Sequence, residues 1–276
     1  MTSISDGTPA SASDRQIPRL PHSLVAHPRY GPLPGLLLVL TVVTGVVDSI
    51  SILSLGRVFV ANMTGNVVFA GFAIVGAPGF SLSASLFALA GFLIGATAGG
   101  AAITRVGSDR AALLRAGTAA EVTLAAVALV LAALSGDPGV THGTMHIATG
   151  AFGPAMTDAL AAVLAIAMGI QNAVARRLAV PDLTTTVLTL TLTGIGADLR
   201  AVLRAGQNHA AATSDLIRRL LAIGTMLAGA LAGASLTLYV SPLSALALAV
   251  SLLAVTAAAA TAAAMRPAAW RTPPPA

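Results

Sequence analysis

A single carboxylate inside a long apolar stretch is the residue of this sequence most suited to chemistry. Asp48 lies among Val, Ile and Ser, and between Leu33 and Thr104 the only other charged residue is Arg57. A carboxylate near the centre of a bilayer is costly unless it faces a partner or water, so such an acid indicates function. A desolvated carboxyl that takes up protons suits proton coupling. The alternatives are a structural hydrogen bond or a pair with Arg57.

Three polar side chains follow close behind this acid, at Asn62, Thr64 and Asn66. Their amides and hydroxyl can replace missing backbone partners where a helix is interrupted, or they can bind a solute. The alternative is a helix N-cap, a position that Asn fills well. A cap beside a cavity could serve both purposes.

A second polar group lies in the other half of the chain. Gln171 and Asn172 interrupt an apolar run and are candidates for the same central site, with polar contact between helices as the alternative. Thr185 and its two threonine neighbours follow Asp182 and are candidates to line a second interruption. Threonine is also common in ordinary transmembrane helices, so packing is the alternative there.

The remaining acids lie near arginines. Glu121 follows Arg115 and is predicted to form an interfacial salt bridge rather than a proton relay. Two further acid–arginine pairs fit the same interpretation, Asp198 with Arg200 and Asp215 with Arg218.

Two histidines have the spacing of zinc ligands on a helix. His142 and His146 are four residues apart, but no acidic partner accompanies them and glycines surround them. A solvated loop is the favoured interpretation, and neither a metal nor a cofactor is expected. No nucleotide-binding loop or Ser-His-Asp arrangement is recognisable, so an enzyme is not expected either.

The elements that position these residues are predicted from composition. The 276 residues are 56% hydrophobic and 9% charged, whereas soluble domains carry about 25% charged residues. A spanning helix needs about 20 mostly apolar residues. The apolar segments are approximately 33–55, 58–78, 84–104, 113–134, 157–175, 183–199, 217–238 and 242–264.

Arginine placement predicts the topology. If segments 58–78 and 183–199 each enter and leave by one face, only Arg57 of the 15 basic residues lies outside. The positive-inside rule favours this arrangement over eight full crossings. The two segments are then broken or re-entrant, with interruptions predicted near Asn62–Asn66 and Thr191–Gly194. Since the basic residues are arginines at the ends of apolar stretches, nucleic-acid binding is not expected.

The two halves of the chain repeat short patterns in the same order. Gly45 with Asp48 matches Gly169 with Asn172, Thr64-Gly65 matches Thr193-Gly194, and Gly95/Gly99 matches Gly229/Gly233. Because each half then has an odd number of crossings, the two halves are inverted, as in many secondary transporters. The Gly-xxx-Gly pairs predict close helix packing.

Two signatures resemble those of a known family. The first is Gly45-Val46-Val47-Asp48-Ser49-Ile50-Ser51 with Val58-Phe59-Val60-Ala61-Asn62-Met63-Thr64-Gly65-Asn66; the second is Gly169-Ile170-Gln171-Asn172-Ala173 with Arg176-Arg177-Leu178 and Pro181-Asp182-Leu183-Thr184-Thr185-Thr186. Over residues 33–264 the chain resembles the YoaK-like bacterial membrane proteins. The resemblance implies a multi-span membrane protein and brings no assigned activity or site residues.

Together these patterns predict an all-α polytopic protein of the bacterial inner membrane. It has about six transmembrane helices, two broken or re-entrant segments and an inverted repeat with halves at 33–134 and 157–264. Residues 1–30 are predicted to be a disordered cytoplasmic tail, and residues 266–276 a Pro-rich cytoplasmic one. The predicted function is small-solute transport of the secondary type. The alternative is a sensor or assembly partner that associates, as a homo-oligomer for example, through its glycine faces.

Overall fold

Six long helices form the body of the protein. The computed structural model describes residues 29–136, 152–180, 188–203, 209–265 and 268–272. Within them, six helices are long and apolar enough to cross a membrane. The shortest, with 22 residues, is about 33 Å long, against about 30 Å for the hydrocarbon core. They are α2 (Leu33–Ser54), α4 (Leu82–Val106), α5 (Arg110–Leu134), α6 (Pro154–Leu178), α8 (His209–Tyr239) and α9 (Pro242–Ala264). The predicted polytopic helical protein is confirmed.

Two helices are too short to cross. Helix α3 (Met63–Ile74) has 12 residues and α7 (Leu188–Leu203) has 16. The predicted interruption near Asn62–Asn66 is confirmed, since the helix begins at Met63. The interruption predicted near Thr191–Gly194 is wrong, because α7 runs through those residues. Thr193 donates to the carbonyl of Thr189 at 2.9 Å, so this hydroxyl is satisfied inside the helix and does not break it.

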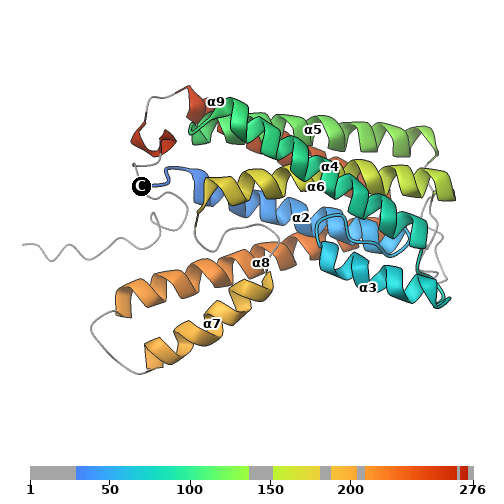
Figure 1. Cartoon of the computed structure of the whole chain (residues 1–276), viewed down its shortest axis with the longest axis horizontal. Helices are drawn as coiled ribbons and strands as arrows, with labels where there is room; N and C mark the ends of the chain where they lie inside the picture. The colour runs from blue at the N-terminus through green and yellow to red at the C-terminus, as the bar shows by residue number, and fades with distance from the viewer. Residues whose placement is uncertain (1–28, 137–151, 181–187, 204–208, 266–267, 273–276) are drawn as a thin grey trace, which may run out of the picture.

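The chain direction confirms the inverted repeat. Helices α2, α5 and α8 run from left to right in Figure 1, and α4, α6 and α9 run back. Each helix of the first half therefore runs opposite to its counterpart in the second half. The segment between α2 and α4 leaves and returns at one end of the bundle, as predicted for a re-entrant segment.

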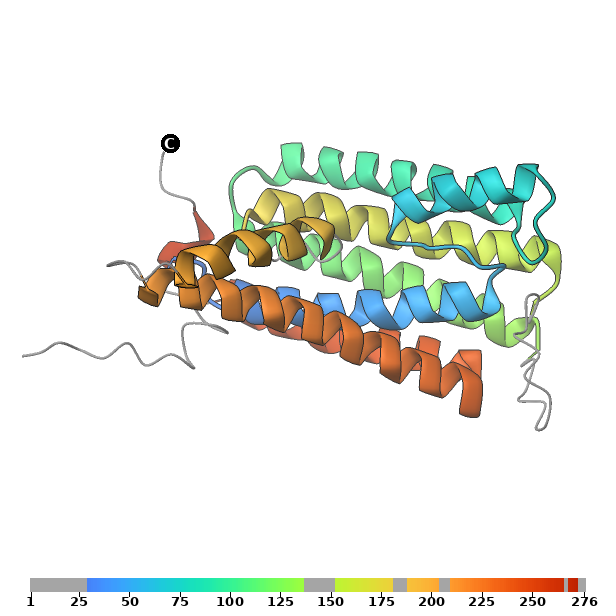
Figure 2. The ribbon, with the colours of Figure 1, turned by 90° about the horizontal axis from the view of Figure 1, so that it is seen from below.

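Packing follows the same pseudo-symmetry. Helix α4 packs most extensively against α6, and their counterparts α8 and α2 form the next largest interface. Helices α3 and α7 pack on the helices that follow them, α4 and α8. The second long helix of each half thus packs against the first long helix of the other half. In Figure 2 these pairs lie side by side along the bundle.

Glycines bring these paired helices into contact. A Cβ atom on Gly45 of α2 would overlap the backbone of α8 at Met226 and Ala230. One on Gly169 of α6 would likewise overlap the backbone of α4, at Phe92. Both helix crossings are possible only without side chains at these positions. Gly95 and Gly229, for which close packing was predicted, meet the backbones of Ile166 and Val42 in the same way. The predicted packing role is therefore confirmed, and it is fulfilled inside one chain.

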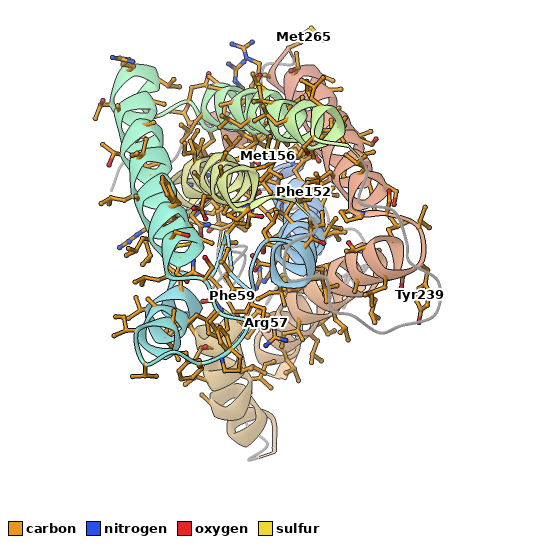
Figure 3. All side chains as sticks on the ribbon, turned by 90° about the vertical axis from the view of Figure 1, so that its right-hand side faces the viewer. Arg57, Phe59, Phe152, Met156, Tyr239 and Met265 are labelled. Atoms are coloured by element: carbon orange, nitrogen blue, oxygen red, sulfur yellow. The ribbon has the colours of Figure 1, made fainter. Side chains whose placement is uncertain are left out.

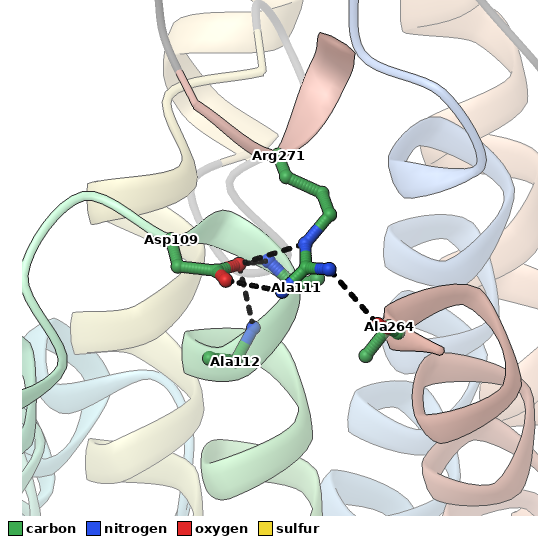
Figure 4. Close-up of polar contacts among 5 residues, drawn as sticks. All are labelled: Asp109, Ala111, Ala112, Ala264 and Arg271. Atoms are coloured by element: carbon green, nitrogen blue, oxygen red, sulfur yellow. Dashed lines mark hydrogen bonds and ion pairs between the residues drawn. The ribbon is translucent and has the colours of Figure 1, made fainter. Parts of the chain in front are cut away.

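A short turn closes the C-terminal side of the bundle. Residues Ala269–Arg271 form a 3-10 helix, η1, and Trp270 is buried against Gly31. Arg271 donates to Asp109, the N-cap of α5, and to the carbonyl of Ala264 at the end of α9 (Figure 4). This part of the predicted free tail 266–276 is therefore docked, because the indole and the guanidinium both find partners.

Candidate functional site

The chain re-enters the bundle directly after α2. Asp48 is buried, and its Oδ1 accepts hydrogen bonds from the backbone N–H groups of Val60 at 3.2 Å and Ala61 at 3.1 Å. Asp48 precedes the last residue of α2, Ser54, by about 9 Å of helix rise. The non-helical stretch before α3 therefore lies at membrane depth, where its backbone groups need protein partners. Asp48 supplies one of them.

Asn66 holds the same stretch from the other side. Its Oδ1 accepts from the backbone N–H of Phe59 at 2.8 Å, and its Nδ2 donates to the Phe59 carbonyl at 2.5 Å. The Phe59 ring lies against Gly65, where a Cβ atom would come within 2.7 Å of a ring carbon. Asp48, Phe59, Gly65 and Asn66 thus form one clamp around residues 58–62, which we call the re-entrant clamp.

Arg57 does not pair with Asp48. Its guanidinium lies over the Phe80 ring at 5.6 Å, and Phe80 packs with Phe69 and Phe72. Figure 3 looks onto this end of the bundle and places Arg57 and Phe59 between α2 and α3. The aromatic cluster anchors the turn into the re-entrant segment. Of the two alternatives predicted for Asp48, the structural hydrogen bond is the one observed.

Asn62 and Thr64 lie differently from Asn66. Asn62 is the N-cap of α3, but its side chain makes no capping hydrogen bond. Both Asn62 and Thr64 are exposed at the first turn of the helix. Two exposed polar side chains at the beginning of a half-helix are poorly suited to lipid and well suited to an aqueous path.

The two polar residues of the second half, Gln171 and Asn172, make different contacts. Gln171 is buried and its Nε2 donates to the Thr44 hydroxyl of α2 at 2.9 Å. Asn172, the counterpart of Asp48, donates to the carbonyl of Met168 in its own helix at 2.8 Å. A polar contact between the halves is thus made by Gln171 and Thr44. Thr185 lies outside the described residues.

The two half-helices oppose each other. In Figures 1 and 2, α3 and α7 begin near the middle of the bundle and run toward opposite ends. Each N-terminus carries a partial positive charge of about +0.5. The arrangement places two positive helix ends near the middle of the bundle, and the first turn of α3 carries the exposed Asn62 and Thr64.

Glu121 lies in a different environment from the one predicted for it. It was predicted to form an interfacial salt bridge, but it is buried at 1% exposure. It has no ion pair among the described residues, because its side chain is packed inside the bundle. The arginines lie near the ends of the helices. Its position in a buried stripe with Gly117, Ala125 and Ala128 was the available signal, since a stripe of small residues marks a packed face.

The other predicted pairs have mixed outcomes. The ion pair of Asp215 with Arg218 is confirmed. The structure does not describe the side chains of Asp198 and Arg200. His142 and His146 both lie outside the described residues. Within the described ranges, no group of three or more His, Cys, Asp or Glu residues could hold a metal ion.

The described surface includes a groove of about 330 Å³ on α8. Its described lining is mainly apolar and includes none of the predicted site residues: Ile217, Leu220, Leu221, Gly224, Thr225 and Ala228. The groove therefore does not correspond to the predicted polar site.

Comparisons with known proteins agree with this architecture. Residues 36–259 match the family described as "Protein of unknown function (DUF1275)". The chain belongs to this family. It is also similar to the UPF0700 transmembrane protein YoaK of Bacillus subtilis (strain 168), with 34% identity over 197 residues, which cover 71% of this chain and 80% of that protein. The expected resemblance to YoaK-like proteins is confirmed, and no solved structure matches the chain.

Proposed function

We propose that this protein is a secondary-type transporter of a small polar solute. The observation that carries the proposal is the opposed pair of half-helices, α3 and α7, within an inverted repeat. In transporters of this architecture the N-termini of interrupted helices bind negatively polarised groups of the substrate near the midplane. The exposed Asn62 and Thr64 at the start of α3 are the residues proposed to contact the solute first.

The re-entrant clamp supports this proposal by fixing the first half-helix in place. Asp48 and Asn66 satisfy backbone groups of residues 59–61, so the N-terminus of α3 stays at membrane depth without lipid-exposed donors. In this proposal Asp48 and Asn66 are positioning residues. Gln171 and Asn172 belong to the facing half.

The proposed orientation puts both termini in the cytoplasm of a bacterial inner membrane. The start of α2 and the end of α9 lie at the same end of the bundle (Figure 1). The same end carries Arg105, Arg110, Arg115, Arg176, Arg177 and Arg271. The positive-inside rule places such an end in the cytoplasm.

The alternative, a sensor or assembly partner without transport, loses its predicted means of association. The faces of Gly95 and Gly229 are filled by α6 and α2 of the same chain. A homo-oligomer would have to use other surfaces. No catalytic activity is proposed.

Cysteine accessibility tests the transport proposal without knowledge of the substrate. The natural chain contains no cysteine, so Asn62→Cys and Thr64→Cys each introduce one thiol. We expect a small membrane-impermeant thiosulfonate to modify both in reconstituted protein. A control thiol on the apolar surface of α3, Val68→Cys, is expected to stay unreactive. Protection of Asn62→Cys and Thr64→Cys from both sides of the membrane would contradict an aqueous path and the transport proposal with it.

A further inference from the structure

Glu121 is a buried carboxyl that the proposed site does not use. It lies on the face of α5 that packs against α6 and α9. Its Oε2 is buried and has no hydrogen-bond partner in the described part of the chain. An ionised carboxylate without a partner is strongly disfavoured in a buried position. We therefore do not expect Glu121 to carry an uncompensated charge.

A second unpaired oxygen lies on the facing helix. Gly117 of α5 contacts Val174 of α6, where a Cβ atom on the glycine would come within 2.9 Å of a valine methyl. The two helices run in opposite directions, so one turn toward the C-terminus of α5 and one turn toward the N-terminus of α6 bring Glu121 to the level of Gln171. The Oε1 of Gln171 is also buried without a partner in the described residues. Two acceptor oxygens without a donor thus lie at the same level of two packed helices.

No described side chain supplies the missing donor. Helix α9 has no charged residue, and α4 offers only the exposed Arg105 at its last turn. On α6 the charged groups are near its two ends, and on η1 Arg271 is bonded to Asp109. The remaining charged groups of these neighbours and of α5 and α2 are Asp158, Arg176, Arg177, Arg110, Arg115 and Asp48. Arg110 lies over Tyr30 and Arg115 is exposed.

We propose that Glu121 is a proton-binding site and that its proton is donated to the Oε1 of Gln171. A proton satisfies both oxygens at once, because a carboxylic acid has one donor and the amide oxygen accepts it. A sodium ion would need several more oxygen ligands than these two side chains provide. The hydroxyl of Thr44 beside Gln171 already accepts from Gln171 and donates to the carbonyl of Leu40.

The proton would control the contact between the halves. When Glu121 releases its proton to water, the carboxylate can only accept, and the side-chain amide donor at its level on α6 is the Nε2 of Gln171. That donor is bonded to Thr44, so the amide must turn and leave α2. Thr44 lies one turn before Asp48, which holds the re-entrant clamp. Glu121 is therefore the coupling acid, a role that rests on the proposed transport function.

Difference infrared spectroscopy on the reconstituted full chain tests proton binding. We expect a C=O band of a protonated carboxyl at neutral pH that is lost in Glu121→Gln and retained in Asp48→Asn. Gln171→Leu is expected to shift this band to higher frequency, because the acid loses its acceptor. A spectrum in which Glu121→Gln removes no protonated band would overturn the proposal. So would a thermal stabilisation by sodium over choline that Glu121→Gln abolishes, since it would assign a metal cation instead.

A second measurement separates the coupling role from the transport proposal. In the Asn62→Cys background, the rate of thiol modification, corrected for thiolate content, is expected to change with pH, and Glu121→Gln is expected to abolish that change. Unchanged pH dependence in Glu121→Gln would remove the coupling role while leaving the aqueous path. An unreactive Asn62→Cys together with an intact protonated band would instead remove the transport function and keep the proton site.

Discussion

Arg271 binds Asp109 with two nitrogens, at 3.4 Å from Nε to Oδ1 and at 2.5 Å from Nη2 to Oδ2. The same carboxylate caps α5, since its Oδ1 accepts from the N–H groups of Ala111 and Ala112. Figure 4 shows that Arg271 also reaches the carbonyl of Ala264. One ion pair therefore joins the start of α5, the end of α9 and the turn that buries Trp270.

Acidification is expected to release this turn. The hydrogen bond from Arg271 lowers the pKa of Asp109 below its ordinary value, and the capping N–H groups act in the same direction against desolvation. A carboxyl with a lowered pKa stabilises the folded state above its unfolded pKa of about 3.9, and this contribution is lost as pH falls through the folded pKa. The pair is about one third exposed, so the contribution is at most about 1 kcal/mol. Trp270 is the only tryptophan, and its emission is expected to shift to the red as pH falls below that unfolded value and through the lowered pKa of Asp109.

Two variants separate the ion pair from the helix cap. Arg271→Gln removes the cation and is expected to give the red-shifted emission already at neutral pH, with α5 still capped. Asp109→Asn keeps a good N-cap residue and is expected to behave in the same way. Emission in Arg271→Gln that matches the natural chain at every pH would show that the indole docks without the ion pair.

Removing the acceptor of the re-entrant clamp is expected to destabilise the protein. Asp48→Val leaves the N–H groups of Val60 and Ala61 without an acceptor, at a cost of about 1–3 kcal/mol for each buried group. Asp48→Asn retains an oxygen acceptor and is expected to unfold near the natural temperature. Circular dichroism of thermal unfolding in detergent measures both. Equal losses in the two variants would mean that the charge of Asp48, and not its acceptor, stabilises the clamp.

Two glycines of α4 are expected to respond oppositely to the same substitution. Gly95→Ala introduces a Cβ atom that overlaps the backbone of Ile166, and it is expected to lower stability by about 1–3 kcal/mol. Gly100→Ala meets nothing within 4 Å and is expected to be neutral or to stabilise the helix by up to about 1 kcal/mol. Thermal unfolding of both variants provides the comparison. Similar stability changes at the two positions would argue against the close crossing of α4 and α6.

The proposed orientation predicts which loops are labelled from outside the cell. Thr141→Cys is expected to react with an impermeant maleimide in intact cells, and Ser108→Cys only after permeabilisation. The reason is that Ser108 lies at the arginine-rich end of the bundle, together with the start of α2 and the end of α9. Labelling of Ser108→Cys alone in intact cells would reverse the orientation.

The fold could be predicted from the sequence wherever a residue type, such as arginine or glycine, has one main physical effect. Charge segregation predicted the long helices, and the arginines predicted the return of residues 58–78 to the same end of the bundle. Gly45 and Gly169 revealed the repeat, because the same close crossing requires the same missing side chain twice. The threonines of α7 misled, because a hydroxyl bonded to its own helix, as in Thr193, resembles in sequence one that lines a cavity.

The roles of individual polar residues were less predictable. Asn62 and Asn66 are of one type and close in sequence, yet one is exposed and the other is buried in the clamp. Only the path of residues 58–62 distinguishes them. Glu121 was assigned to the membrane interface from its distance to Arg115 along the chain, whereas its burial depends on α6 and α9, which come later in the sequence. Partners of that kind are not visible in a local pattern.

The interlocked pairing of α2 with α8 has a consequence for synthesis. Helix α2 has 67% of its most apolar window buried, against 22% for α4, but α8 begins only at His209. At about 5–20 residues per second, α2 waits on the order of ten seconds for its main partner. Thr41 and Thr44 bond to carbonyls of their own helix, and Asp48 finds its donors 12 and 13 residues later. The hydrogen bonds of α2 to its own half thus close soon after it leaves the ribosome, whereas its glycine face, the Gln171 contact and the hydrogen bond from Ser49 to the carbonyl of Ala230 wait for the second half.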